Sequence, residues 1–254
     1  MSRDENEGED VASQERRPRR GWRMSRARFG AVNESEAVAL QESLRERVDV
    51  STGLARPPEL VAGVDVSYAV GDDRLVAAIA VLAFPSLELA ELVTVAGAAE
   101  FPYIPGLLGF REVPILLEAM KKLTVTPDVF VCDGYGIAHP RRFGLACHLG
   151  VVTGIAAFGV GKTAFVGTFS EPAPQRGATA DLVHEGEVVG RAVRTQPGVK
   201  PVFVSAGHLI DLDTSVALTL ELAPRYRLPE TTRFADHASR EALVTQRLRS
   251  RPAA

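Results

Sequence analysis

Hydrophobic positions gather in three neighbouring segments in the first half of the chain. Leu60–Tyr68, Leu75–Phe84 and Leu87–Val95 each have the length and composition of a strand. A turn at Gly71–Asp73 separates the first two segments. Because the three segments follow one another so closely, the pattern predicts an antiparallel meander.

Upstream of the meander, apolar residues recur at helical spacing. Asn33 and Glu36 stand three residues apart and resemble a capping box, which marks the start of a helix. The apolar positions that follow are Ala37, Leu40, Leu44 and Val48. This spacing predicts an amphipathic helix before the first strand.

Beyond residue 100, helical and strand patterns alternate. The expected helices are Arg111–Leu123, Arg142–Leu149, Asp213–Leu222 and His237–Arg249, and the expected strands are Val129–Cys132, Gly154–Val160, Ala164–Gly167, Glu187–Thr195 and Pro201–Ser205. Pro114 is compatible with the first helix only in its first turn, and Glu230–Asp236 is expected to be a loop. This order predicts an α/β fold with one mixed sheet covered by helices.

The composition narrows the class of protein. The 254 residues are 46% hydrophobic and 24% charged, as in ordinary globular proteins. No apolar run reaches the roughly 18 residues of a membrane span. Cys132 and Cys147 are too few for a disulfide framework or a four-cysteine zinc site, and both lie in apolar stretches typical of buried thiols. The net charge of −3 means that a polyanionic partner must be held locally or through metal ions.

Residues 1–28 differ from the rest of the chain. An acidic block is followed by a run of arginines, with no apolar core of the kind a secretory signal contains. The segment is either a solvated disordered tail or an arm that adds phosphate contacts. We therefore place the folded domain at residues 29–254.

Two aspartates stand on predicted central strands. Asp65 lies inside Leu60–Tyr68, where an unpaired carboxylate is expensive to bury. It faces solvent, pairs with an arginine or binds a metal ion. Asp133 follows a short buried strand and precedes Gly134, so it is either a turn residue or a site residue at the carboxyl end of a strand.

Two further acids stand near expected helix starts. Glu112 opens one helix, where an acid interacts favourably with the helix dipole. Asp236 precedes another helix and could be its N-cap. Each acid alone is a weak signal. Together the four favour a cluster for a hard cation such as Mg²⁺, which would activate water and neutralise charge on a phosphate.

Other chemical motifs are weaker. His139 and His208 are by default neutral core or loop histidines, and the zinc-protease and paired-cysteine patterns are absent. Lys162 follows a glycine in a segment similar to a P-loop, but the first glycine of that motif is missing. This excludes a nucleoside triphosphate site and leaves Lys162 available for a phosphate.

Taken together, the motifs resemble the endonuclease V family, nucleases that recognise deaminated adenine. The matching segments are Val61–Tyr68, Phe101–Glu112, Asp133–Gly150, Gly159–Lys162, Lys200–His208 and Tyr226–Asp236. They follow the family's order and cover nearly all of residues 33–241. The resemblance implies a ribonuclease H-like fold, in agreement with the predicted mixed sheet.

The resemblance also implies a reaction. The family cleaves, with Mg²⁺ and with Mn²⁺ able to substitute, the second phosphodiester 3′ to a deoxyinosine, leaving 3′-hydroxyl and 5′-phosphate ends. Asp65, Glu112 and Asp133 match its metal-binding catalytic acids. Asp236 matches a further active-site position, and Lys162 matches a lysine near the scissile phosphate.

Two loops match the family's lesion-recognition parts. Tyr103, Ile104, Pro105 and Gly106 match its strand-separating wedge, in which a flat ring fills the gap left by an extruded base. The residues that match its base pocket are Leu108, Gly134, Gly136 and His139. A backbone donor facing the hypoxanthine oxygen would reject adenine, which carries an amine there.

The resemblance implies a DNA-repair enzyme that acts as a monomer in the cytoplasm, without a membrane partner. Three alternatives remain open at this stage. They are an endonuclease for inosine-containing RNA, a lesion-binding protein without turnover, and a structure-selective nuclease or resolvase of the same fold. A lost carboxylate, the feature expected of the second, is absent from the sequence.

Overall fold

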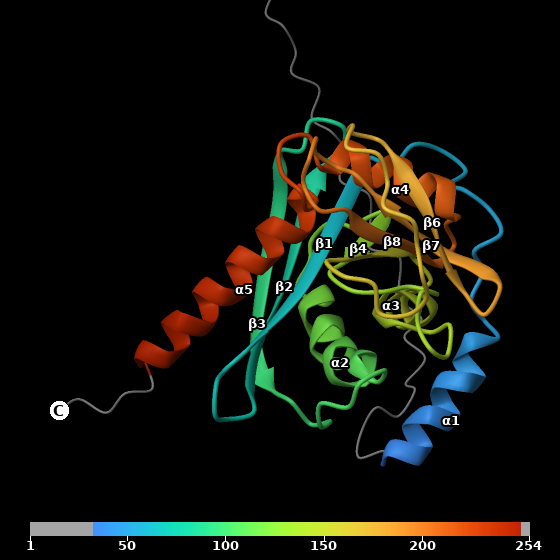
Figure 1. Ribbon diagram of the computed structural model, residues 1–254. Coiled ribbons are helices and arrows are strands. Elements are labelled where there is room, and N and C mark those ends of the chain that lie inside the picture. The colour runs from blue at the N-terminus through green and yellow to red at the C-terminus, as the bar shows by residue number, and fades with distance from the viewer. Residues whose placement is uncertain (1–32, 250–254) are drawn as a thin grey trace, which may run out of the picture.

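The computed structural model describes residues 33–249 (Figure 1). The arm predicted at residues 1–28, and its boundary with the folded domain, lie outside this range. The helices are α1 (Glu34–Arg45), α2 (Leu108–Met120), α3 (Leu145–Thr153), α4 (Leu212–Leu222) and α5 (Glu230–Arg249). The strands are β1 (Leu60–Tyr68), β2 (Arg74–Ala83), β3 (Leu89–Ala98), β4 (Val129–Cys132), β5 (Ala156–Gly161), β6 (Thr179–His184), β7 (Glu187–Val193) and β8 (Val202–His208).

All eight strands form one sheet in the order β3-β2-β1-β4-β5-β8-β7-β6. The central strands β1, β4 and β5 are parallel to one another, and every other neighbouring pair is antiparallel. Strands β1, β2 and β3 form the predicted meander. The expectation of one mixed sheet covered by helices is therefore confirmed.

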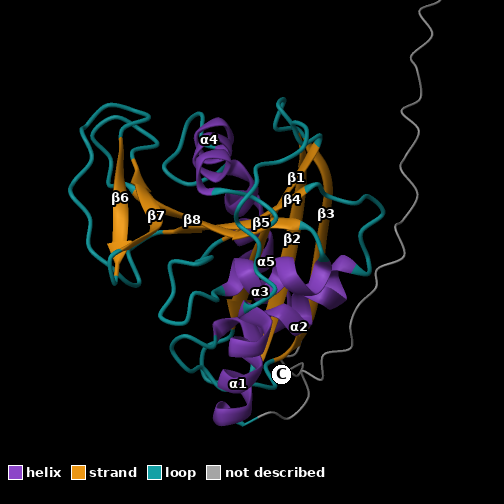
Figure 2. Cartoon of the chain, turned by 90° about the vertical axis from the view of Figure 1, so that its right-hand side faces the viewer, coloured by secondary structure: helices purple, strands orange, loops and turns teal. Residues whose placement is uncertain are grey.

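Helices cover both faces of the sheet (Figure 2). On one face α2 and α3 pack on a core that includes Leu75, Ile79 and Phe130. On the other face α4 packs beside Phe158 in a second core, and α5 crosses β1, β2 and β3. Helix α1, with the capping box predicted at its start, packs against α3 at the periphery. None of the described helices is long and apolar enough to cross a membrane.

Small residues bring α5 close to the sheet. Ala78 and Ala80 of β2 face Ala235 and Ala238 of the helix. At Gly63 of β1, a Cβ atom would overlap the backbone at the start of α5, so only glycine allows this approach. The close packing sets the distance between α5 and the edge of β1.

Three predicted helix starts were wrong. Helix α3 begins at Leu145 rather than Arg142. Helix α2 begins at Leu108 rather than Arg111, so Pro114 is its seventh residue and lies beyond the first turn. Helix α5 begins at Glu230 rather than His237, so the segment predicted as a loop is its first two turns. For α2 the prediction kept Pro114 in the first turn and so began the helix too late. For α5 the polar first residues interrupt the apolar spacing on which the prediction depended.

The strand prediction failed at two places. Residues 164–167 are not a strand. The next residue, Thr168, makes an isolated bridge to Val183. Strand β6 was missed, although it pairs with β7 through a tight turn with positive φ at Glu185 and Gly186. Such a polar–glycine pair between two strands is a hairpin signal, and it could have identified β6.

Candidate active site

The two strand-borne aspartates lie side by side. Val64 of β1 pairs with Cys132 of the parallel strand β4. Asp65 is the next residue of β1 and Asp133 directly follows β4, so the two reach the same edge of the sheet. This arrangement was the central structural expectation, and the register confirms it. Parallel strands end together at this edge, where sites in α/β folds commonly form.

Asp65 is half-buried and is held by α5. The Ser239 hydroxyl donates to Asp65 Oδ2 at 2.5 Å, and Ser239 also hydrogen-bonds the Ser67 hydroxyl at 2.7 Å. Burial raises the pKa of Asp65, and the carboxylates of Asp133 and Asp236 add to this effect. Ser239 was not identified from the sequence, because it belongs to no chemical motif and its position depends on how α5 packs.

Glu112 approaches the same edge from α2. It is only 7% exposed, and the Tyr68 hydroxyl donates to its Oε1 at 2.9 Å. Burial raises the pKa of Glu112 to about 8, with further contributions from Asp65 and Asp133. Glu112 is the fifth residue of its helix rather than the first, so a favourable interaction with the helix dipole no longer accounts for it.

Two cations contact the remaining acids. Lys162, just after β5, places its Nζ 2.5 Å from Asp133 Oδ2. Arg240 places Nη2 2.8 Å from Asp236 Oδ1, one turn earlier on α5. Asp236 therefore lies within the second turn of α5, and the interpretation as an N-cap was wrong.

The donor chemistry at this edge fits a hard divalent cation. Asp65, Glu112 and Asp133 offer only carboxylate oxygens, the ligands that Mg²⁺ prefers. Burial raises the pKa of Asp65 and of Glu112, and neighbouring carboxylates raise both further, so the negative charges disfavour one another. A cation would relieve that repulsion. Within residues 33–249, no three His, Cys, Asp or Glu side chains are already arranged as a ligand set.

The predicted wedge is a projecting loop with a fixed base. Tyr103 is 70% exposed. The carbonyl of Gly106 accepts hydrogen bonds from Gln41 Nε2 (3.0 Å), Arg141 Nη2 (2.9 Å) and His139 Nε2 (3.0 Å). His139 Nδ1 accepts from the Arg141 amide, so Nε2 carries the proton. Burial lowers the pKa of His139 to about 4, which keeps the ring neutral.

A cavity of about 190 Å³ lies beside the wedge. Its lining includes three groups identified from the sequence: residues 103–106, Leu108 and His139. It also includes Tyr135 and Phe165, whose rings stack with centroids 5.2 Å apart. Phe165 was not identified, because no motif covers it and its loop was predicted as a strand.

The two predicted pocket glycines do not line this cavity; they flank Tyr135, which does. The Gly136 amide donates to the Ser205 hydroxyl at 2.8 Å, so this N–H is already used within the protein. A Cβ on Gly136 would collide with the Ala206 carbonyl, whereas one on Gly134 would come no closer than 3.8 Å to Leu145. Gly136 is therefore required by packing, and Gly134 is not.

His208 lies away from the acids. It pairs with Ala157 near the beginning of β5, whereas Lys162 follows the end of that strand. Ala157 and Lys162 are five residues apart along the strand, which corresponds to about 16 Å. His208 Nδ1 accepts from the Asp49 amide at 3.2 Å, and burial lowers the pKa of the ring, as for a neutral core histidine.

Comparisons with known proteins agree with this geometry. The family model described as Endonuclease V matches residues 42–237. An Endonuclease V of Streptomyces avermitilis is 51% identical over 214 residues, which are 84% of this chain and 93% of the relative. The crystal structure of the Streptomyces avermitilis protein superimposes with a TM-score of 0.82 at 50% identity, covering 85% of this chain and 95% of the other.

A more distant neighbour carries nucleic acid. Endonuclease V of Ciona intestinalis, in complex with DNA containing an inosine followed by a ribo-adenosine, superimposes with a TM-score of 0.73 at 29% identity. The match covers 83% of this chain and 98% of the other. With its ribonuclease H-like mixed sheet and the neighbouring aspartates on two of its central strands, this chain is an endonuclease that belongs to the Endonuclease V family.

Proposed function

We propose that this endonuclease repairs deaminated adenine by cutting DNA near deoxyinosine. In this proposal it hydrolyses the second phosphodiester 3′ to the lesion with Mg²⁺ and leaves 3′-hydroxyl and 5′-phosphate ends. The observation that carries the proposal is the position of the acids next to the cavity. Tyr135 follows Asp133 by two residues, and Phe165 follows Lys162 by three. Two short segments therefore contribute side chains both to the group of acids and to the cavity.

Each side chain of the site has a separate role in this proposal. Asp65, Glu112 and Asp133 would hold the metal, which supplies an activated water and stabilises charge on the leaving 3′-oxygen. Lys162, already at Asp133, would contact a phosphate oxygen. Neutral His139 keeps the wedge in place through Gly106, and Tyr103 would stack where the inosine has left the helix.

A labelled duplex with a single deoxyinosine tests the proposal. With Mg²⁺, we expect one nick between the first and second nucleotides 3′ to the lesion, and no nick with EDTA or with adenine at the same position. Mn²⁺ should restore activity after EDTA. Mapping the product ends on a sequencing gel decides the position. A cut elsewhere, or cleavage of branched DNA without inosine, would refute the proposed function.

A ribonucleolytic alternative has one observation in its favour. The Ciona intestinalis protein was crystallised on a strand in which a ribo-adenosine follows the inosine. Comparing three matched strands with deoxyadenosine, a single ribo-adenosine or all ribonucleotides around the inosine separates the two activities. We expect the all-deoxy strand to be cut; cleavage restricted to strands with a ribonucleotide after the inosine would assign the protein to RNA.

Tyr103→Ala should weaken binding of the inosine duplex about 10- to 100-fold, because stacking on one base contributes about 1–3 kcal/mol. Tyr103→Phe should bind like the unaltered protein, since it keeps the ring and loses only the hydroxyl. Fluorescence anisotropy in EDTA measures both affinities. Equal binding by the alanine variant would show that the exposed ring at 103 is not the wedge.

A further inference from the structure

A second hollow, a cleft of about 370 Å³, lies at the same edge of the sheet. The cavity beside residues 103–106 adjoins the starts of α2 and α3, on one face of the sheet. The cleft adjoins the first turns of α5, on the other face. Asp133 and Lys162 line the cleft, while Tyr135 and Phe165 line the cavity. The edge of the sheet that carries Asp65 and Asp133 therefore lies between the cavity and the cleft.

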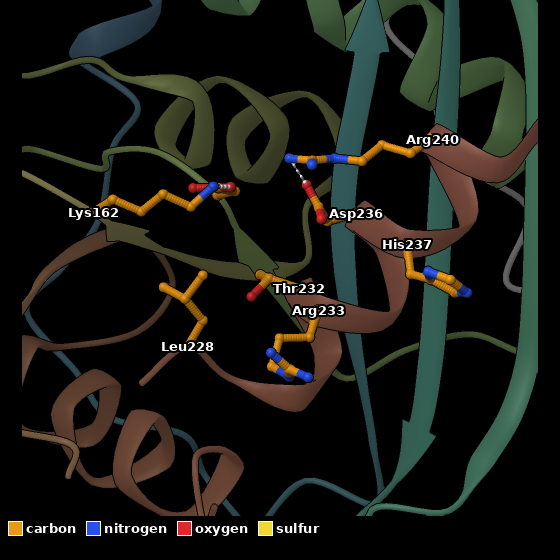
Figure 3. A pocket seen from close by; sticks show the side chains of 8 residues that line it. Lys162, Leu228, Thr232, Arg233, Asp236, His237 and Arg240 are labelled. Atoms are coloured by element: carbon orange, nitrogen blue, oxygen red, sulfur yellow. Dashed lines mark hydrogen bonds and ion pairs between the residues drawn. The ribbon is translucent and has the colours of Figure 1, made fainter. Parts of the chain in front are cut away.

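The cleft carries more positive than negative charge. Among its described lining residues, Lys162, Arg233 and Arg240 carry fixed positive charge, and Asp133 and Asp236 carry carboxylates. Figure 3 shows the two arginines on α5 with Asp236 between them along the helix, and Lys162 across the cleft. Each of the three cations is paired with a carboxylate, namely that of Asp133, Glu230 or Asp236. Three cationic side chains gathered in one hollow of a chain of net charge −3 indicate a place for a polyanion, whose phosphates would replace these partners.

The two arginines are presented differently. The Arg233 guanidinium lies over the Tyr226 ring, 3.6 Å from its centroid, and its Nε contacts Glu230 at 3.4 Å. Arg240 is 67% exposed and contacts Asp236. Seven residues of helix separate them, a rise of about 10 Å. The pair can therefore contact a nucleic-acid strand at two points along its path.

We propose that this cleft binds the strand on the 3′ side of the cleaved bond. The inference rests on the proposed function, which places the inosine in the cavity and the cut 3′ to it. A strand that runs from the cavity across the acids must continue into the α5 cleft, and its next nucleotides are those 3′ of the cut. Arg233 and Arg240 bind the phosphates of these nucleotides.

Salt-dependent binding of two single-stranded oligonucleotides tests this directly. Both carry a 5′ dye and one inosine; the short one ends one nucleotide after the inosine, and the long one continues for eight more. Binding is measured in EDTA, so no cleavage occurs. For the long strand we expect each of Arg233→Gln and Arg240→Gln to lower the slope of log K against log[salt] by about 0.7, the contribution of one phosphate contact in a single strand. The short strand should show no change.

Matched variants exclude indirect effects. Arg240→Lys keeps the charge and should keep the slope. Arg56→Gln serves as the control, because Arg56 is also half-exposed and ion-paired, to Glu59 at 2.8 Å, but lies at the opposite edge, before β1 begins. We expect Arg56→Gln to leave both strands unaffected, and all variants to keep the melting temperature.

Three outcomes would overturn the assignment. An equal loss of binding on both strands would place the arginines elsewhere along the substrate. A loss on a third strand, which carries the eight extra nucleotides on its 5′ side, without a loss on the long strand would reverse the direction of the strand through the protein. The nicking assay with the deoxyinosine duplex decides the proposed function separately, since an unchanged slope with correct nicking removes only the role of this cleft.

Discussion

Asp65→Asn and Asp133→Asn are each expected to slow nicking of an inosine duplex by at least about 1,000-fold. If either carboxylate holds the metal, its loss removes several kcal/mol of charge stabilisation from the transition state, and about 1.4 kcal/mol corresponds to a factor of ten in rate. Single-turnover rates at saturating enzyme measure the effect without a contribution from binding. Affinity for the inosine duplex in EDTA should remain close to that of the unaltered protein.

Stability separates this result from simple unfolding. Burial, and to a smaller extent two neighbouring carboxylates, raise the pKa of Asp65, so a neutral amide of the same shape should leave the melting temperature unchanged or higher. Addition of Mg²⁺ should raise the melting temperature of the unaltered protein but not of either variant, because only a site that binds the ion gains stability from it.

Asp181→Asn is the matched control, since Asp181 lies on β6, towards the far edge of the sheet, and pairs with Arg191. It should behave like the unaltered protein in both measurements. Nicking at the normal rate by Asp65→Asn or Asp133→Asn would remove the metal assignment.

The sequence alone placed the first pair of acids along the chain. Strands β1 and β4 were predicted with the bounds that the structure has, because both are rich in valine and other apolar residues and are followed by turn-forming residues. Their parallel pairing, which the hydrophobic pattern did not predict, brings Asp65 and Asp133 together. The position of a buried strand can be predicted from its apolar residues, so a polar residue within the strand or directly after it can be placed as well.

The second pair of acids could not be placed in this way. Asp236 was predicted in a loop because Thr231 and Thr232 are poor helix formers and show no apolar spacing. In the structure those two residues are buried against the sheet, where tertiary packing outweighs local preference. Glu112 was placed at a helix start for a related reason: Pro114 favoured a later beginning than the one that α2 has.

Contacts that depend on three-dimensional packing left no signal in the sequence. Ser239 reaches Asp65 only because small residues let α5 lie close to β1. Phe165 reaches the cavity only because its loop folds against Tyr135. Resemblance to a family predicted roles for the acids and for residues 103–106, but it could not point to residues that lie outside the family's motifs.

Gly136→Ala is expected to destabilise the protein by about 3 kcal/mol or more, whereas Gly134→Ala in the same loop should change stability by less than about 1 kcal/mol. A Cβ at Gly136 would approach the Ala206 carbonyl more closely than any non-bonded contact allows, and would also lie 2.8 Å from the Ser205 carbonyl oxygen. At Gly134 the nearest atoms are 3.8 Å away, which is an ordinary contact. Neither glycine has positive φ, so alanine adds no backbone strain at either position.

Thermal unfolding of the two variants measures this difference. For a domain of this size, 3 kcal/mol corresponds to a melting temperature lower by roughly 6–12 °C. Inosine binding then tests the pocket role that the resemblance implies for both glycines. Gly134→Ala should melt normally, so any loss of its affinity for inosine over adenine would be an effect of the added methyl group on base recognition and not of unfolding. If Gly136→Ala melted like the unaltered protein, β8 would have moved away from the loop, and the packing reason for this glycine would be wrong.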